Sequence, residues 1–86
     1  MQRNTDPAAD DVLRRVTEVI AETFGVDAGS IGEQTVAEDV PGWDSLSHTI
    51  LTLALEEAFG VPIPPQSREF ANVGELAATL SELIRR

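Results

Sequence analysis

Apolar residues recur at helical spacing in the first part of the chain. Between residues 7 and 24 they fall three or four positions apart, which places them on one face of an α-helix. Asp6-Pro7 is a typical helix start, because a carboxylate caps free backbone N–H groups and proline needs no N–H at the first helical position. Gly25 can adopt the left-handed backbone that ends helices. The pattern predicts a helix over 7–24 with an apolar row of Leu13, Val16, Ile20 and Phe24, flanked by Val12 and Val19.

The second half of the chain predicts three further helical segments. The longest covers residues 45–59, where either Asp44 or Ser45 would serve as N-cap and Gly60 ends the helix. Proline-rich sequence follows, and Gln66–Phe70 leaves room for one short helical turn. Asn72 with Glu75 three residues later resembles a capping box. It opens a last helix whose apolar row continues to the C-terminus through Leu76, Leu80, Leu83 and Ile84.

These elements predict an all-α fold: a small four-helix bundle of three longer helices and one short third helix. Residues 25–43 form a long loop between helices one and two. Such a loop needs anchors in a small domain, and we expect it to carry the chain from one end of helix one towards the other. We divide the chain into a flexible segment, 1–6, and a helical domain, 7–86. The expected loop anchors are Val26, Ile31, Val36 and Val40.

The helix over 45–59 has two apolar faces. At roughly 100° per residue, Leu51, Leu55 and Phe59 share one side with Ala58. A second apolar row, made of Leu46, Ile50 and Leu53, lies on nearly the opposite side. One interpretation is a central helix that is buried all round. We favour an exposed second row covered by another protein, because acids beside it are costly to bury unpaired. The predicted partner-binding residues are Leu46, Thr49, Ile50, Leu53, Glu56 and Glu57.

Composition narrows the function further. The chain has 86 residues, 15 acidic residues, six arginines, no lysine and a net charge of −9. Seven acids and no base lie in residues 25–60, so we expect a basic protein partner and neither nucleic acid nor a membrane surface. Cysteine is absent, no calcium loop is present, and one histidine cannot build a zinc site, so we predict no metal centre. The N-terminus lacks a secretory signal, which favours a cytoplasmic location.

Ser45 admits three interpretations. It can be a plain N-cap. It can be a nucleophile activated by His48, three residues further along the helix, although an oxyanion hole, an orienting acid and a closed pocket would also be needed. It can also be a modification site, because the start of a helix favours an attached phosphate.

The motif around Ser45 resembles that of the acyl carrier protein family. Asp44-Ser45-Leu46 follows Gly42-Trp43 and opens a helix that closes with Leu-Glu-Glu-Ala-Phe-Gly at 55–60. The similarity extends from helix one to Ile84, so residues 7–86 would form an acyl-carrier-like domain.

The resemblance implies a specific chemistry. A phosphopantetheinyl transferase would move 4′-phosphopantetheine from coenzyme A to the Ser45 hydroxyl, with Asp44 and Leu46 in its recognition motif. The protein would then be a monomeric, non-catalytic carrier. It would hold acyl groups as thioesters on the thiol of the arm. Its partners would be an acyl-loading enzyme and acyl-processing or ketosynthase-type enzymes with basic surfaces.

The chain also departs from the carriers of fatty-acid synthesis. Fatty-acid carriers are similar to one another in having acidic residues at the positions that Ser47 and Ile50 occupy in this chain. Ala58 likewise replaces an acid that is frequent in those carriers. These changes favour a carrier of a specialised polyketide or mixed peptide–polyketide pathway. An aminoacyl or peptidyl carrier, including the D-alanyl type, would use the same arm. An unmodified acidic adaptor and a small hydrolase using Ser45 and His48 are the alternatives from other classes.

Overall fold

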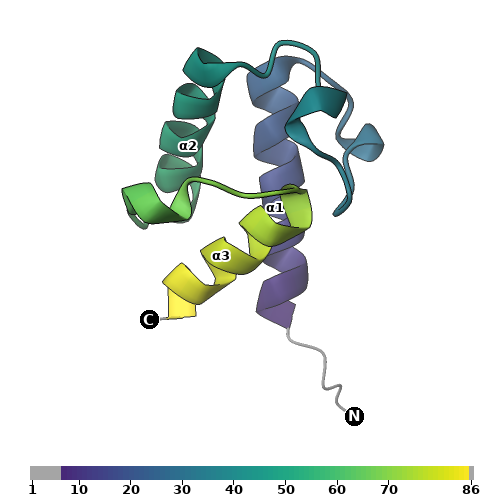
Figure 1. Cartoon of the computed structure of the whole chain (residues 1–86). Coiled ribbons are helices and arrows are strands. Elements are labelled where there is room, and N and C mark those ends of the chain that lie inside the picture. The colour runs from purple at the N-terminus through teal and green to yellow at the C-terminus, as the bar shows by residue number, and fades with distance from the viewer. Residues whose placement is uncertain (1–6, 86) are drawn as a thin grey trace.

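The computed structural model describes residues 7–85, and the regular elements in this part of the chain are all helices, with no strand (Figure 1). The predicted all-α class is confirmed. The flexible segment expected at 1–6, with the proposed cap Asp6, lies outside the described residues. The α-helices are α1 (Pro7–Phe24), α2 (Ser45–Phe59) and α3 (Val73–Arg85), and the one-turn 3-10 helices are η1 (Ala28–Ser30), η2 (Ala37–Asp39) and η3 (Pro65–Ser67).

The short helical turn predicted near Gln66–Phe70 is present, but it does not form a fourth α-helix. Residues 65–67 form the single 3-10 turn η3, and no α-helix covers Gln66–Phe70. The amide of Ser67 donates to the Pro64 carbonyl over 2.8 Å, and the amide of Arg68 donates to the Pro65 carbonyl over 3.2 Å. The described residues therefore form three α-helices, rather than four.

The core is built around α1, which packs against both α2 and α3 (Figure 1). The predicted apolar faces are confirmed except at Ile84, which ends the predicted row on α3 and is 40% exposed. Val16, Ile20, Leu51, Leu55 and Leu80 are fully buried. Burying each such side chain contributes about 1.5–3 kcal/mol. The buried cluster consists of Val12, Val16, Val19, Ile20, Ile31, Leu51, Leu55, Ile63, Val73, Leu76, Ala77 and Leu80.

The loop between α1 and α2 turns back to the end of α1 where it began. Trp43, just before α2, stacks on Phe24, the last residue of α1, with ring centroids 5.0 Å apart. Thus α1 and α2 run in opposite directions (Figure 1). The expectation that this loop spans the length of helix one is wrong. Of the expected anchors, Ile31 and Val40 are buried.

The middle of this loop contacts the start of α3 through the backbone. The amide of Val73 donates to the Thr35 carbonyl, and the amide of Gly74 donates to the Glu33 carbonyl, each over 2.9 Å. A Cβ at Gly74 would lie 3.2 Å from that Glu33 oxygen, so the close approach favours glycine. These two bonds give α3 partners for amides that a helix start leaves free.

The predicted residues end α2 and begin α3, with one hydrogen bond displaced by a residue. Gly60 ends α2 in the left-handed conformation, with φ 69°. The Asn72 side chain accepts from the Glu75 amide over 2.8 Å, but Glu75 accepts from the amide of Ala71, not from that of Asn72. The first hydrogen bond of the predicted capping box is therefore present, and the second is made to the residue before Asn72. Within the described residues, none of the helices has the length and apolar character needed to cross a membrane.

Candidate functional site

The start of α2 separates the roles of Asp44 and Ser45. Asp44 is the N-cap: its Oδ1 accepts from the Ser47 amide over 2.9 Å, and its carbonyl accepts from the His48 amide over 2.8 Å. Ser45 is the first residue of the helix and is exposed. Within the described residues its hydroxyl has no hydrogen-bond partner, so the interpretation of Ser45 as a plain N-cap is wrong.

The cap also keeps Asp44 ionised. The backbone amide of Ser47, followed by the Ser47 hydroxyl, holds the pKa of the Asp44 carboxyl below its ordinary value. Hydrogen bonds donated to a carboxylate stabilise its charged form, and the positive end of the helix dipole acts in the same direction. The residue that precedes Ser45 therefore carries a negative charge.

Four rings pack together behind this helix start. The Trp43 ring stacks on Phe24 and meets Phe70 edge-on, with centroids 5.9 Å apart. The His48 ring stacks on Phe70 at 5.3 Å. The rings come from the end of α1, the loop before α2, the first turns of α2 and the segment before α3. The sequence analysis did not assign Phe70 to the site, because its position after a proline-rich turn carries no helical period.

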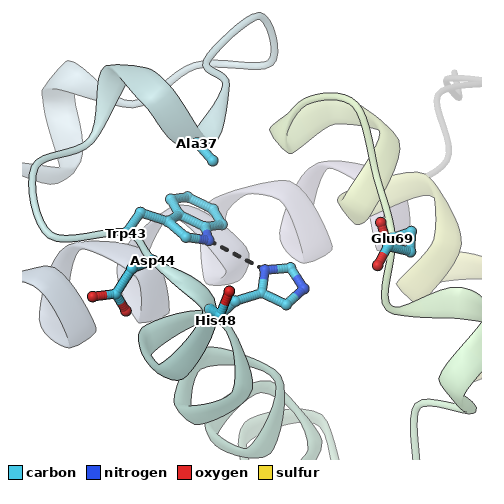
Figure 2. Close-up of a pocket in the computed structure, with 6 residues that line it drawn as sticks. Ala37, Trp43, Asp44, His48 and Glu69 are labelled. Atoms are coloured by element: carbon cyan, nitrogen blue, oxygen red, sulfur yellow. Dashed lines mark hydrogen bonds between the residues drawn. The ribbon is translucent and has the colours of Figure 1, made fainter.

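Both ring nitrogens of His48 are engaged. Trp43 Nε1 donates to His48 Nδ1 over 3.2 Å (Figure 2), and His48 Nε2 lies 2.8 Å from the Arg68 carbonyl oxygen. An indole N–H can only donate and a carbonyl can only accept. These partners therefore select a neutral imidazole with its proton on Nε2. Neither nitrogen is left to take a proton from Ser45, which removes the base that a Ser45–His48 hydrolase needs.

Ser45 borders an open hollow of about 500 Å³ lined by six residues. Glu69 lies across this hollow from the Trp43–His48 pair, and Ala37 lies beside the indole (Figure 2). Two acidic residues, Asp44 and Glu69, thus line the same hollow as the serine. Among the described residues, no group of three or more histidine, aspartate or glutamate side chains is placed to hold a metal ion.

Comparison with known families matches residues 14–80, most of the chain, to the family described as "Phosphopantetheine attachment site". The chain belongs to the phosphopantetheine-attachment family. The cofactor of this family is a covalently attached 4′-phosphopantetheine, which supplies a thiol for thioester chemistry. Members of the phosphopantetheine-attachment family are generally non-catalytic carriers. They interact with a phosphopantetheinyl transferase and with biosynthetic enzymes.

The residues at the start of α2 fit a phosphopantetheine group. An exposed hydroxyl without an internal hydrogen bond is available for esterification, and an anionic phosphate is favoured at a helix N-terminus. Leu46, the next residue, is 71% exposed. The predicted motif residues Asp44, Ser45 and Leu46 therefore lie together on the surface.

The second apolar row of α2 is exposed, as predicted. Ile50 is 50% and Leu53 is 54% exposed, whereas Leu51 and Leu55 on the opposite face are fully buried. The interpretation of a helix buried all round is wrong. Thr49 and Glu57 are also exposed, which completes a continuous outward face beginning at Leu46.

Glu56 differs from the other residues predicted at this face. Its side chain is only 23% exposed. Its Oε2 accepts from the Ile63 amide over 2.7 Å and lies 3.5 Å from the Arg68 guanidinium. Arg68 Nε in turn donates to the Ile63 carbonyl over 3.0 Å. Glu56 thus ties the segment after α2 to the helix, a role that sequence reasoning missed.

Proposed function

We propose that Ser45 carries the 4′-phosphopantetheine arm and that the protein holds acyl intermediates on it as thioesters for partner enzymes. The observation that carries this proposal is the Ser45 hydroxyl, which is exposed at the first position of α2 while Asp44 does the capping. The Ser45 oxygen would form the phosphoester as the diphosphate bond of coenzyme A breaks, which releases adenosine 3′,5′-bisphosphate and the hydroxyl proton. The transferase supplies the base, because both nitrogens of His48 are already engaged.

The outward face of α2 is the proposed binding surface for the transferase and for the later enzymes. Leu46, Ile50 and Leu53 provide exposed apolar area for burial, and Glu57 provides an exposed charge at its end. A partner with an apolar centre and a basic rim would match this surface. Thr49 lies within the same face, and Glu56 contributes a partly shielded charge.

The cargo that we propose is an acyl group of a polyketide or mixed peptide–polyketide pathway. The support is the neutral, apolar centre of the α2 face, where Ile50 stands in place of an acid. Because charge mainly sets the encounter rate and buried apolar contact slows dissociation, such a face selects partners by apolar fit. An aminoacyl or peptidyl cargo uses the same arm and is the alternative outcome of the loading experiment.

Attachment is tested by intact mass after incubation with coenzyme A, Mg²⁺ and a broad-specificity phosphopantetheinyl transferase. The wild-type chain should gain the mass of one phosphopantetheine, and Ser45→Ala should gain none. Ser47→Ala is the matched control, because it removes a neighbouring hydroxyl but keeps the Ser47 amide that caps with Asp44. Wild-type protein that stays unmodified while a control carrier is modified would contradict the proposal and favour the adaptor alternative.

Cargo is tested on the modified protein. We would incubate it with acyl-activating and with aminoacyl-activating enzymes and weigh the product intact. A gain of an acyl mass alone supports the proposed cargo, whereas a gain of an amino acid alone replaces it with the aminoacyl alternative.

A further inference from the structure

We propose that His48 is a positioning residue of the attachment site: through its hydrogen bond with Trp43 it fixes the segment that presents Ser45 to the transferase. This inference rests on the proposed attachment at Ser45. It assigns His48 no proton transfer and no contact with the reacting atoms.

The Trp43 and His48 rings belong to residues on either side of Ser45 in the sequence. Trp43 lies two residues before Ser45 and His48 three residues after it. Their hydrogen bond therefore closes a side-chain link across the serine. Asp44, Ser45 and Leu46 are all exposed, so none of them anchors the segment by burial. The half-buried Trp43 and His48 are the residues that attach it to the body of the protein.

The loop before α2 is held by few backbone hydrogen bonds. Gly42 has φ 87°, which glycine adopts without strain. Because glycine adopts negative φ values as readily, Gly42 does not by itself fix the direction of the chain. The backbone bonds around it are local: Trp43 N–H to the Val40 carbonyl at 3.3 Å and Asp44 N–H to the Gly42 carbonyl at 3.1 Å. Local bonds alone can form in several orientations of the loop. Packing of the indole between Phe24 and Phe70 fixes its plane, and the bond to His48 fixes its rotation.

The imidazole of His48 suits both of its hydrogen-bond partners. Trp43 can only donate, so its partner must present an acceptor at the Nδ1 position. The Arg68 carbonyl, 2.8 Å from Nε2, holds the proton on Nε2 and so keeps Nδ1 free to accept. The segment after α2 thereby sets the tautomer that the Trp43 bond requires.

Two amide substitutions at His48 separate the hydrogen bond of Nδ1 from that of Nε2. In His48→Asn the side-chain oxygen can take the place of Nδ1 and accept from Trp43. In His48→Gln the longer side chain can take the place of Nε2 and donate to Arg68, leaving Trp43 without its acceptor. Each variant keeps one of the two hydrogen bonds. Urea unfolding of both variants would verify that they are folded at the assay temperature and equally stable.

The measurement is phosphopantetheine transfer at varied carrier concentration, using a broad-specificity transferase with coenzyme A and Mg²⁺. A segment that samples several orientations lowers the competent fraction, which raises the apparent KM without changing kcat. If the competent fraction falls to about one tenth, KM rises about tenfold. We expect this rise in KM for His48→Gln and for Trp43→Phe. The phenylalanine keeps an aromatic ring at position 43 but removes the N–H donor. We expect a KM near the wild-type value for His48→Asn.

Fluorescence gives a second readout, because Trp43 is the single tryptophan of the chain. His48→Asn should keep the wild-type emission, and His48→Gln should shift it. Equal KM values for the wild type and both His48 variants, or a rise in KM for Asn alone, would overturn the inference while leaving attachment intact. Absence of any transfer to the wild-type chain would overturn the proposed function instead.

Discussion

The Asp44 carboxylate accepts a hydrogen bond from the Ser47 amide over 2.9 Å, and this bond leaves Ser45 free for chemistry. Both residues can cap a helix, but only the one with extended backbone before the first turn does so. Asp44 has that backbone, with φ −119° and ψ −171°. Ser45 therefore falls inside the helix, where its hydroxyl faces solvent. Placing the capping residue immediately before the proposed attachment residue stabilises the helix start and leaves the Ser45 hydroxyl without a hydrogen bond.

The Asp44 cap predicts a pH dependence of stability. The pKa of this carboxyl is lowered by folding, so its stabilising contribution is present above its unfolded value and is lost as the pH falls through its lower, folded value. Asn caps as well but does not titrate. We expect wild type to be more stable than Asp44→Asn near neutral pH, with a gap that narrows below about pH 4.

Urea midpoints measured from pH 7 to acid check this prediction. Glu69→Gln is the control, because it removes a charge from the same hollow without removing a cap. A gap between wild type and Asp44→Asn that stays constant across the acid range would show that the carboxylate contributes nothing through its charge.

The two faces of α2 predict opposite costs for the same substitution. Leu55 is fully buried, so Leu55→Ala should lower the free energy of unfolding by about 2–5 kcal/mol. Leu53 is half exposed, and Leu53→Ala should change that free energy by about 0.5 kcal/mol or less. Urea unfolding of both variants is the measurement. Similar losses for the two variants would mean that the faces are misassigned.

A substitution at Ile50 should change partner binding without changing the stability of the fold. Because Ile50 is half exposed, Ile50→Glu should leave the thermal midpoint nearly unchanged. It should weaken binding to the transferase, because a charge would be buried at the apolar centre of the proposed interface. Ala78→Glu, an exposed site on α3, is the control for added negative charge. Equal transferase Kd values for these two variants would argue against the α2 face as the interface.

Periodicity predicted most of the core, because burial on one face leaves a direct record in the spacing of residues. Leu51 and Leu55 against Ile50 and Leu53 is the clearest case: spacing separates two faces of one helix, the neighbouring acids indicate which face is exposed, and the two faces have opposite exposure. Periodic signals of this kind depend only on local helix geometry.

The path of the loop and the ties around the site could not be predicted in this way. The return of the loop depends on Trp43 meeting Phe24, a contact between residues far apart in sequence. Likewise, the acids Glu56 and Glu57 are adjacent and look equivalent in sequence. Only the position of the Ile63 amide and of Arg68 makes Glu56 an internal partner.

This difference between Glu56 and Glu57 yields the last prediction. Glu56→Ala removes the acceptor of the partly buried Ile63 amide, so it should cost about 1–3 kcal/mol of unfolding free energy. Glu57→Ala should leave stability within about 0.5 kcal/mol, because Glu57 is exposed. It should instead slow association with a basic partner and weaken the dependence of that rate on salt. Stopped-flow binding to the transferase at several salt concentrations, paired with urea unfolding, measures both effects. If Glu57→Ala left the association rate unchanged at low salt, the negative charge at this end of α2 would have no part in partner encounter.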